Sequence, residues 1–373
     1  MRSRKWIGMV LTGTLALGGA GVLSACSAPS SQNGSGGAAV EAKATTVSFI
    51  DDAGRENTIP APDYLTSVYC TSPIGQVYLF SLTPEKAAGT TMKISEAEMK
   101  YLPECVSGLE NIGSWAMGGT LDTEGLIANG VQMIINVSNA ALTDGDIDSA
   151  NALQDQTGIP VLLFDGTVDK TPETYRSIGR ALGQTEAAEE KAEYLEGVLK
   201  DVTEAVATVP ESERVSVYYA EGPKGLKTEP ENSPHFATFK QAGAKDVATC
   251  DLTKGPGMTD VSLEDVIAWN PQVIIAWDDV YKGGADELIR TDSNWASIDA
   301  VANNRVYTIP CLPYTWGDRP PSVTRYIGMQ WMANKLYPDV YNVNMVDETK
   351  KFYKIVLNVE LTDDEAQSIL FEK

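Results

Sequence analysis

An internal repeat is the feature of this sequence that most constrains its fold. Residues 123–135 align without a gap with residues 263–275, and the two copies share a Glu, an Ala, a Gln and an Ile-Ile pair. Each copy has the pattern of a short helix, a turn and a buried strand. The sequence therefore predicts two similar halves, related by something near a two-fold axis.

Short β-branched segments alternate with helical stretches along both halves. This alternation predicts an α/β fold with mostly parallel sheets. We expect strands at residues 46–50, 67–69, 132–137, 160–164, 215–219, 273–277 and 305–309. Two such lobes that face each other form a ligand cleft at the carboxyl ends of their strands.

The segment between the two copies predicts a connecting helix. Thr171-Pro172-Glu173 has Pro in the first turn of a helix, and apolar residues recur at helical spacing from Leu195 to Val206. A helix over 185–208 would be about 36 Å long, enough to reach from one lobe to the other. An ordinary surface helix within one domain is the alternative.

These patterns divide the chain into segments of different character. We expect a signal peptide over residues 1–25, a lipidated cysteine and flexible tether over 26–45, an N-terminal α/β lobe over 46–170, a linking helix over 171–210, and a C-terminal α/β lobe with C-terminal helices over 211–373.

The first residues indicate export and lipid anchoring. Basic residues between Arg2 and Lys5 precede a glycine-interrupted apolar stretch, which is typical of a signal peptide. The segment Leu23-Ser24-Ala25-Cys26 resembles the bacterial lipobox, in which the cysteine carries a diacylglyceryl group. The following Ser- and Gly-rich residues suit a flexible tether. We therefore expect an extracytoplasmic, membrane-anchored lipoprotein.

Charge excludes nucleic acid as a partner. The chain has 51 acidic against 29 basic residues, a formal net charge of −22. Such a surface is repelled by phosphates and by anionic lipid headgroups, so the lipid anchor would hold the protein at the membrane. We expect a monomer.

Four cysteines remain after Cys26. An even number outside the cytoplasm permits two disulfides, and three connectivities are possible. The one that keeps each bridge within a lobe joins Cys70 with Cys105 and Cys250 with Cys311. No Cys-x-x-Cys spacing is present, and a single histidine, His235, cannot build a site from several imidazoles. We therefore expect no bare metal ion and no cofactor.

Several motifs in order resemble one family. They are Asp52-Ala53-Gly54-Arg55, the repeat, Gly243-Ala244-Lys245-Asp246-Val247-Ala248, Asn304-Arg305-Val306-Tyr307-Thr308-Ile309-Pro310 and Trp316-Gly317-Asp318-Arg319-Pro320-Pro321-Ser322. Over about residues 46–370 the chain resembles periplasmic substrate-binding proteins of the iron-complex and cobalamin importer group, class III of the periplasmic binding proteins. The resemblance implies two lobes joined by one rigid helix and delivery of a ligand to an ABC permease dimer. The Trp316 motif and the tail lean toward its molybdate and tungstate branch.

Glu124 and Glu264 occupy matching positions in the two copies of the repeat. The family resemblance implies that an acidic residue at this place on each lobe docks with arginines of the permease. Charges of this kind mainly set orientation and association rate. Each glutamate is also favourable simply as a carboxylate in the first turn of a helix. Both roles are compatible.

Ligand-binding candidates lie where predicted strands end. On the N-terminal lobe they are Tyr69, Thr71, Ser72, Ser114, Trp115, Ser138 and Asn139, and on the C-terminal lobe Tyr219, Glu221, His235, Trp277, Asp278, Tyr314, Trp316 and Arg319. Thr71 and Ser72 begin a helix that either receives an anion or is merely capped by them. Arg319 either pairs bidentately with an anionic ligand or forms a salt bridge with Asp318 or a neighbour.

The candidates suit two kinds of ligand. Their aromatic rings favour a ferric siderophore, haem or a corrinoid, with His235 either an axial ligand to iron or a surface group. A small oxyanion such as molybdate or tungstate is the alternative. A hydrolase using Asp278 and Asp279 is a remote third, because no nucleophile elbow, phosphate loop or metal-ligand spacing is present. We therefore expect a binding protein and not an enzyme.

Overall fold

The computed structural model describes residues 44–115, 122–252, 257–278 and 282–371, and residues from Ala44 onward form one compact unit. The predicted signal peptide, Cys26 and nearly all of the tether lie outside the described residues. Within the described ranges, no helix combines the length and the apolar character that crossing a membrane requires.

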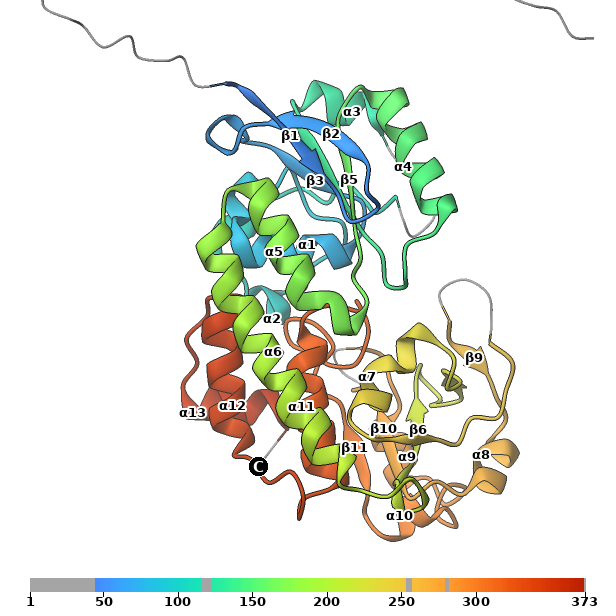
Figure 1. The fold of residues 1–373 in the computed structure, drawn as a ribbon. Coiled ribbons are helices and arrows are strands. Elements are labelled where there is room, and N and C mark those ends of the chain that lie inside the picture. Colours follow the sequence, from blue (N-terminus) through green and yellow to red (C-terminus); the bar gives the residue numbers. More distant parts are fainter. Residues whose placement is uncertain (1–43, 116–121, 253–256, 279–281, 372–373) are drawn as a thin grey trace, which may run out of the picture. The chain divides into compact units, whose positions relative to one another are not determined.

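A three-stranded parallel sheet forms the centre of the N-terminal lobe (Figure 1). Its order is β3 (Val68–Cys70), β4 (Met133–Val137) and β5 (Val161–Phe164). β1 (Thr46–Ile50) and β2 (Glu56–Pro60) add an antiparallel hairpin. The helices of this lobe are α1 (Pro73–Leu82), α2 (Glu96–Met99), α3 (Thr123–Ala128), α4 (Asp144–Thr157) and α5 (Thr171–Leu182).

The C-terminal lobe is built on a four-stranded parallel sheet. Its order is β11 (Val306–Thr308), β10 (Val273–Ala276), β6 (Ser216–Ala220) and β8 (Lys245–Asp246). β7 (Lys227–Thr228) pairs with β9 (Thr259–Asp260) outside this sheet. The helices are α7 (Ala237–Gln241), α8 (Leu263–Trp269), α9 (Asp286–Thr291), α10 (Asp299–Ala302), α11 (Thr324–Leu336), α12 (Met345–Phe352) and α13 (Asp363–Ile369). The predicted α/β class with mostly parallel sheets is confirmed.

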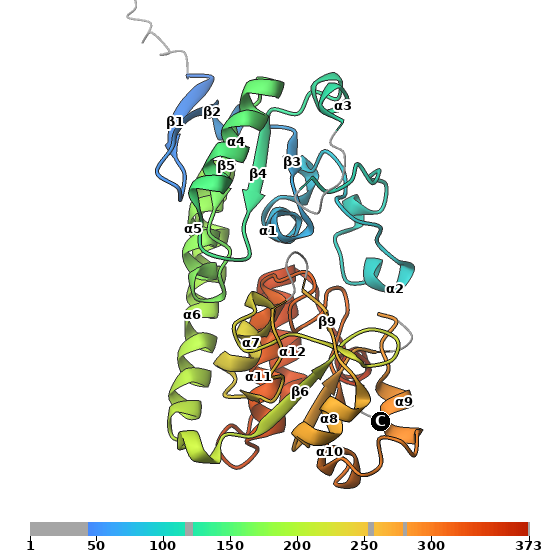
Figure 2. The same ribbon diagram turned by 90° about the vertical axis from the view of Figure 1, so that its right-hand side faces the viewer.

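The long helix α6 (Thr185–Ala207) connects the two parallel sheets in the chain. It packs against α5 and against α11, and in Figure 2 it leads into the connection to β6. One face of each sheet contributes to a single apolar cluster, which also includes residues of α1, α5, α6, α11 and α12. The other face of each sheet has a cluster of its own, around Ile134 in one lobe and Ile274 in the other. Each sheet is therefore buried on both faces.

The two copies of the repeat have the same structure. α3 precedes β4 and α8 precedes β10, and each of these strands lies at the interior of its sheet. The repeated glutamines act alike. Gln132 Oε1 accepts from the backbone N–H of Thr66 at 2.7 Å, and Gln272 Oε1 accepts from that of Ser216 at 2.9 Å. In both lobes the glutamine side chain thus fixes the start of the neighbouring strand.

The disulfide prediction is wrong. All four cysteines of the described chain are free thiols. Cys70 and Cys311 are buried in the apolar core, whereas Cys105 is exposed on a 3-10 turn and Cys250 is half-buried. A bridge needs both sulfur atoms in one place, but each expected pair joins a core position to a residue nearer the surface. The core positions are explained by packing, because a buried thiol behaves as a small apolar group.

Candidate functional site

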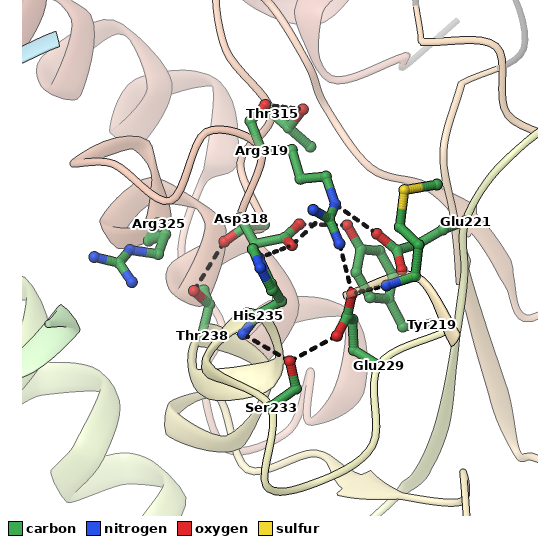
Figure 3. A network of polar contacts seen from close by, with 12 residues as sticks. Tyr219, Glu221, Glu229, Ser233, His235, Thr238, Thr315, Asp318, Arg319 and Arg325 are labelled. Carbon is green, nitrogen blue, oxygen red and sulfur yellow. Dashed lines mark hydrogen bonds and ion pairs between the residues drawn. The ribbon is translucent and has the colours of Figure 1, made fainter. Parts of the chain in front are cut away.

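Polar side chains converge at the carboxyl edge of the C-terminal sheet (Figure 3). Tyr219 lies in β6 and Glu221 directly follows it, while Trp277 directly follows the neighbouring strand β10. Arg319 lies in the loop between β11 and α11. The carboxyl ends of adjacent parallel strands share one edge of the sheet, so residues about 100 positions apart meet there.

Arg319 is the centre of this polar cluster. Its Nε lies 2.8 Å from Glu221 Oε1 and 3.4 Å from Asp318 Oδ2, and its Nη2 lies 2.5 Å from Glu229 Oε1. The guanidinium also lies over the Trp277 ring, 5.8 Å from its centroid. Of the two roles considered for Arg319, the salt bridge with Asp318 and its neighbours is present.

A chain of hydrogen bonds holds Asp318 in place. Trp277 Nε1 donates to the Tyr219 hydroxyl at 2.6 Å, and that hydroxyl donates to Asp318 Oδ1 at 2.5 Å. On the other carboxylate oxygen, His235 Nδ1 lies 2.9 Å from Oδ2. The predicted candidates Tyr219, His235, Trp277 and Arg319 are thus brought together around one carboxylate.

Glu229 was not predicted from the sequence. It follows a two-residue strand, and its position in the cluster depends on a turn that is distant in the chain. The backbone N–H of Met258 donates to Glu229 Oε1 at 2.6 Å, and Ser233 Oγ donates to Oε2 at 2.6 Å. A Cβ added at Gly257, where φ is +76°, would overlap Glu229 Oε1. Gly257 was the one sequence feature that could have indicated a close contact at this position.

The cluster contains more carboxylates than cations, and this changes the protonation of Glu221. Burial, followed by the negative charge of Asp318, raises the pKa of Glu221 to about 9. Burial and the same charge hold the pKa of Tyr219 well above its ordinary value. Burial and Asp318 therefore favour the protonated form of Glu221, while Arg319 favours its ionised form and neutralises the charge of the carboxylates in part.

The N-terminal candidates lie at the carboxyl edge of the other sheet. Thr71 Oγ1 donates to Asn136 Oδ1 at 2.8 Å, and Ser114 Oγ donates to the Thr71 carbonyl at 3.0 Å. Tyr69 is buried, and its hydroxyl donates to the Gly113 carbonyl at 3.1 Å. Ser138 Oγ donates a hydrogen bond to the carbonyl of Ala140, two residues further along the chain, at 2.5 Å.

Ser72 occupies the N-cap position of the ten-residue helix α1. Its hydroxyl is buried and forms no hydrogen bond with the described part of the chain, either to the first turn of α1 or elsewhere. Serine at this position normally accepts from the helix backbone. The amino end of α1, the positive end of its dipole, therefore presents a buried hydroxyl that has no hydrogen-bond partner among the described residues.

Arg325 was also missed from the sequence. It lies in the first turn of α11 and is only 1% exposed. Its Nε donates to the Ser322 carbonyl at 3.2 Å, and its Nη2 donates to the Gly166 carbonyl at 2.6 Å. Ser322 lies just before α11 and Gly166 lies two residues after β5, so this side chain joins the start of α11 to the loop at the carboxyl edge of the N-terminal sheet. It forms no ion pair with a carboxylate of the described residues.

Two predicted ligand contacts are part of the core. Tyr314 and Trp316 belong to the apolar cluster shared by the two sheets, and both are buried. Trp115 is half-buried against the cluster around Ile134. Asp279 lies outside the described residues. Glu124 and Glu264 are both exposed in the first turns of α3 and α8, as their matching positions require. The described residues contain no group of three or more His, Cys, Asp or Glu placed to hold a metal ion.

Comparison with known proteins agrees with this architecture. Residues 139–311 match the family model described as periplasmic binding protein. The molybdate-binding protein MolA of Haemophilus influenzae is 35% identical over 121 residues, which cover 31% of this chain. That match spans about a third, 33%, of the curated relative's own length.

Solved structures match over nearly the whole described unit. An ABC transporter solute-binding protein from Sulfurospirillum deleyianum superposes with a TM-score of 0.79 at 28% identity, covering 87% of this chain and 99% of that one. Haemophilus influenzae MolA bound to molybdate gives a TM-score of 0.67 at 19% identity, covering 85% and 99%. The latter likeness concerns the fold.

Proposed function

We propose that this chain is the extracytoplasmic solute-binding component of an ABC importer and captures a small oxyanion. The match of residues 139–311 to the periplasmic binding protein model supports the transport role. Molybdate and tungstate are the oxyanions we propose, because a relative with 35% identity over 121 residues is a molybdate-binding protein. The protein would bind its ligand and release it unchanged to a permease dimer, without catalysis.

The buried charge of Arg325 is the observation that carries this proposal. Burial lowers the pKa of this side chain, but guanidinium stays protonated in proteins. A buried charge is normally paired, because leaving it unpaired in a low dielectric is costly. Here the guanidinium contacts two backbone carbonyls, one at the start of α11 and one in the loop after β5. An anionic ligand would supply the missing charge.

Ser72 supports the same class of ligand. The amino end of α1 provides backbone N–H groups, the positive end of a helix dipole and a buried hydroxyl that has no partner in the described chain. These groups bind oxyanions in many proteins. Arg319 reduces the opposing charge of the nearby carboxylates, because it contacts both Glu229 and Asp318.

The burial of the aromatic candidates favours a small ligand over a bulky one. A ferric siderophore, haem or corrinoid needs exposed ring faces. Tyr69, Tyr219, Tyr314 and Trp316 are buried in the protein, and only Trp115 and Trp277 are half-buried. The first expectation from the sequence, an iron chelate or corrinoid, therefore has less support than the oxyanion.

Two further parts of the proposal concern location. Lipid on Cys26 would tether the binding unit to the membrane through the Ser- and Gly-rich segment, and Glu124 and Glu264 would dock with permease arginines. A Cys26→Ala protein should still bind its ligand but be released from the membrane fraction, which fractionation and immunoblotting would detect. Retention of this variant in the membrane would contradict the anchor.

Calorimetric titration of the purified chain with molybdate, tungstate, sulfate and phosphate tests the ligand class, with haem and a ferric siderophore as competitors. We expect Arg325→Met to abolish oxyanion binding and Arg325→Lys to retain part of it, since lysine keeps the charge but loses the planar fork. Ligand at 100 times its dissociation constant should stabilise the wild type by about 2.7 kcal/mol. Saturable binding of haem or siderophore alone would overturn the proposal, as would unchanged molybdate affinity in Arg325→Met.

A further inference from the structure

A cavity lies away from the carboxyl edges of the sheets. It has a volume of about 420 Å³ and is bounded by α6, α11, the residues before α12 and α12 itself. We call it the α6 groove. Its lining residues are Glu193, Tyr194, Gly197, Val198, Asp201, Gln330, Tyr341, Val343, Glu348 and Lys351. The volume falls within the range of small-molecule sites.

The floor of the groove contains an unused hydrogen-bond acceptor. Gln330 is only 4% exposed, and its Nε2 donates to the Tyr341 hydroxyl at 3.1 Å and to Glu348 Oε2 at 3.2 Å. The carboxylate fixes this orientation, because only the amide nitrogen can donate to it. Gln330 Oε1 is then buried without a partner in the described chain. A buried acceptor left in this state is costly.

The lining around this acceptor has a net negative charge. The lining has three carboxylates, Glu193, Asp201 and Glu348, against the single ammonium of Lys351. Lys351 Nζ lies over the Tyr194 ring, 5.2 Å from its centroid, so the rim already holds one ammonium group on a ring face. The buried hydroxyl of Tyr194 has no hydrogen-bond partner among the described residues.

We propose that the α6 groove binds a small organic cation with N–H donors, a primary ammonium or a guanidinium group. The cation would donate to Gln330 Oε1 and to the Glu348 carboxylate, beneath the position of Lys351. An anion would face three carboxylates, and a neutral alcohol would leave them without a countercharge. This site is independent of the proposed oxyanion site, which depends on Arg325 and Ser72.

Two variants probe the groove without touching the sheets. A Cβ added at Gly197 meets no heavy atom within 4 Å, so α6 accepts a side chain there, and we expect Gly197→Leu to fill the groove. Gln330→Met removes the acceptor at similar volume. Ala207→Leu is the matched control, since Ala207 is an exposed residue of the same helix outside the groove.

Calorimetric titration of the purified full chain with 1,4-diaminobutane, and with 1-butanol as the neutral comparison, tests the proposal. We expect saturable binding of the diamine, its loss in Gly197→Leu, about tenfold weaker binding in Gln330→Met, and no change in Ala207→Leu. Lys351→Met should bind the diamine more tightly, because a competing ammonium is removed. Molybdate affinity measured on the same variants should equal that of the wild type, which separates this site from the oxyanion proposal.

Three results would overturn the inference. The first is the absence of saturable diamine binding by the wild type. The second is equal diamine affinity of the wild type and Gly197→Leu. The third is loss of diamine binding in Arg325→Met together with its retention in Gly197→Leu, which would place the cation at the carboxyl edges of the sheets.

Discussion

Lys282 Nζ lies 2.7 Å from Glu98 Oε1, although the two residues are 184 positions apart in the sequence. Glu98 belongs to α2 in the N-terminal lobe, and Lys282 lies in the loop that follows β10. The side chains are only 19% and 11% exposed, for lysine and glutamate respectively. The other oxygen of Glu98 accepts from the Ser95 backbone N–H and hydroxyl, which fixes the carboxylate in the capping box of α2.

Breaking this ion pair should destabilise the protein measurably. Lys282→Met leaves a mostly buried carboxylate without its charge partner, and we expect the free energy of unfolding to fall by about 1–2 kcal/mol. Urea unfolding would measure it. Lys350→Met is the control, because the pair Lys350–Asp363 is far more exposed. Equal effects of the two substitutions would show that the contact between Glu98 and Lys282 contributes no more than a surface pair.

The pKa of Glu221 predicts a falling stability with rising pH. The unfolded carboxyl titrates near 4.5 and the folded one near 9, so between these values the folded state binds more protons and alkali favours unfolding. Asp318 and Glu229 face this group and strengthen the effect, while Arg319 opposes it. Glu221→Gln removes the titration. The unfolding free energy of Glu221→Gln minus that of the wild type should therefore increase as pH rises from 5 to 9. The increase should be at most about 1.4 kcal/mol per pH unit.

A second titrating group provides the comparison for that experiment. Burial raises the pKa of Asp246 to about 7, so Asp246→Asn should flatten the pH profile mainly below that pH. Parallel profiles for the wild type and Glu221→Gln in urea unfolding between pH 5 and 9 would contradict the assignment of the proton to Glu221.

Gly257 should tolerate no side chain. Gly257→Ala combines the cost of φ +76° with a clash against the Glu229 carboxylate, and should displace that carboxylate from Arg319. Gly54 has φ +77° but no neighbour within 4 Å of an added Cβ, so Gly54→Ala measures the backbone cost alone. We expect Gly257→Ala to cost about 1–3 kcal/mol more than Gly54→Ala in thermal unfolding.

The docking proposal separates ligand binding from transport. A Glu124→Ala, Glu264→Ala protein should bind its oxyanion as the wild type does but support little uptake into cells that express the permease, because rim charges set orientation and association rate. Glu186→Ala with Glu287→Ala is the matched control, since these are exposed first-turn carboxylates of α6 and α9. Unchanged uptake by the first double variant would refute the docking role.

Local patterns were enough to predict the repeat and seven strands, but they missed β2 and the two-residue strands β7, β8 and β9. β10 is apolar throughout and β4 is apolar except at Asn136, because both faces of each strand are buried, and this pattern is visible in the sequence. Gln132 and Gln272 occupy equivalent positions in the two copies because the side chain of each accepts a backbone hydrogen bond at the start of the neighbouring strand. Tyr219, Trp277 and Arg319 were found as candidates because they follow strands or lie in a Gly- and Pro-rich loop.

Tertiary structure alone decided how these candidates are used. Arg319 is bonded to Glu221 and Glu229, 98 and 90 positions away, and Arg325 reaches the carbonyl of Gly166, 159 positions away. Tyr314 and Trp316 are packed in the apolar core, and the four cysteines are not joined by disulfides. The sequence determines which segments form strands and helices, because that depends on neighbours a few residues away. Which charges meet, and which charge stays buried without an ion pair among the described residues, depends on how distant segments pack together.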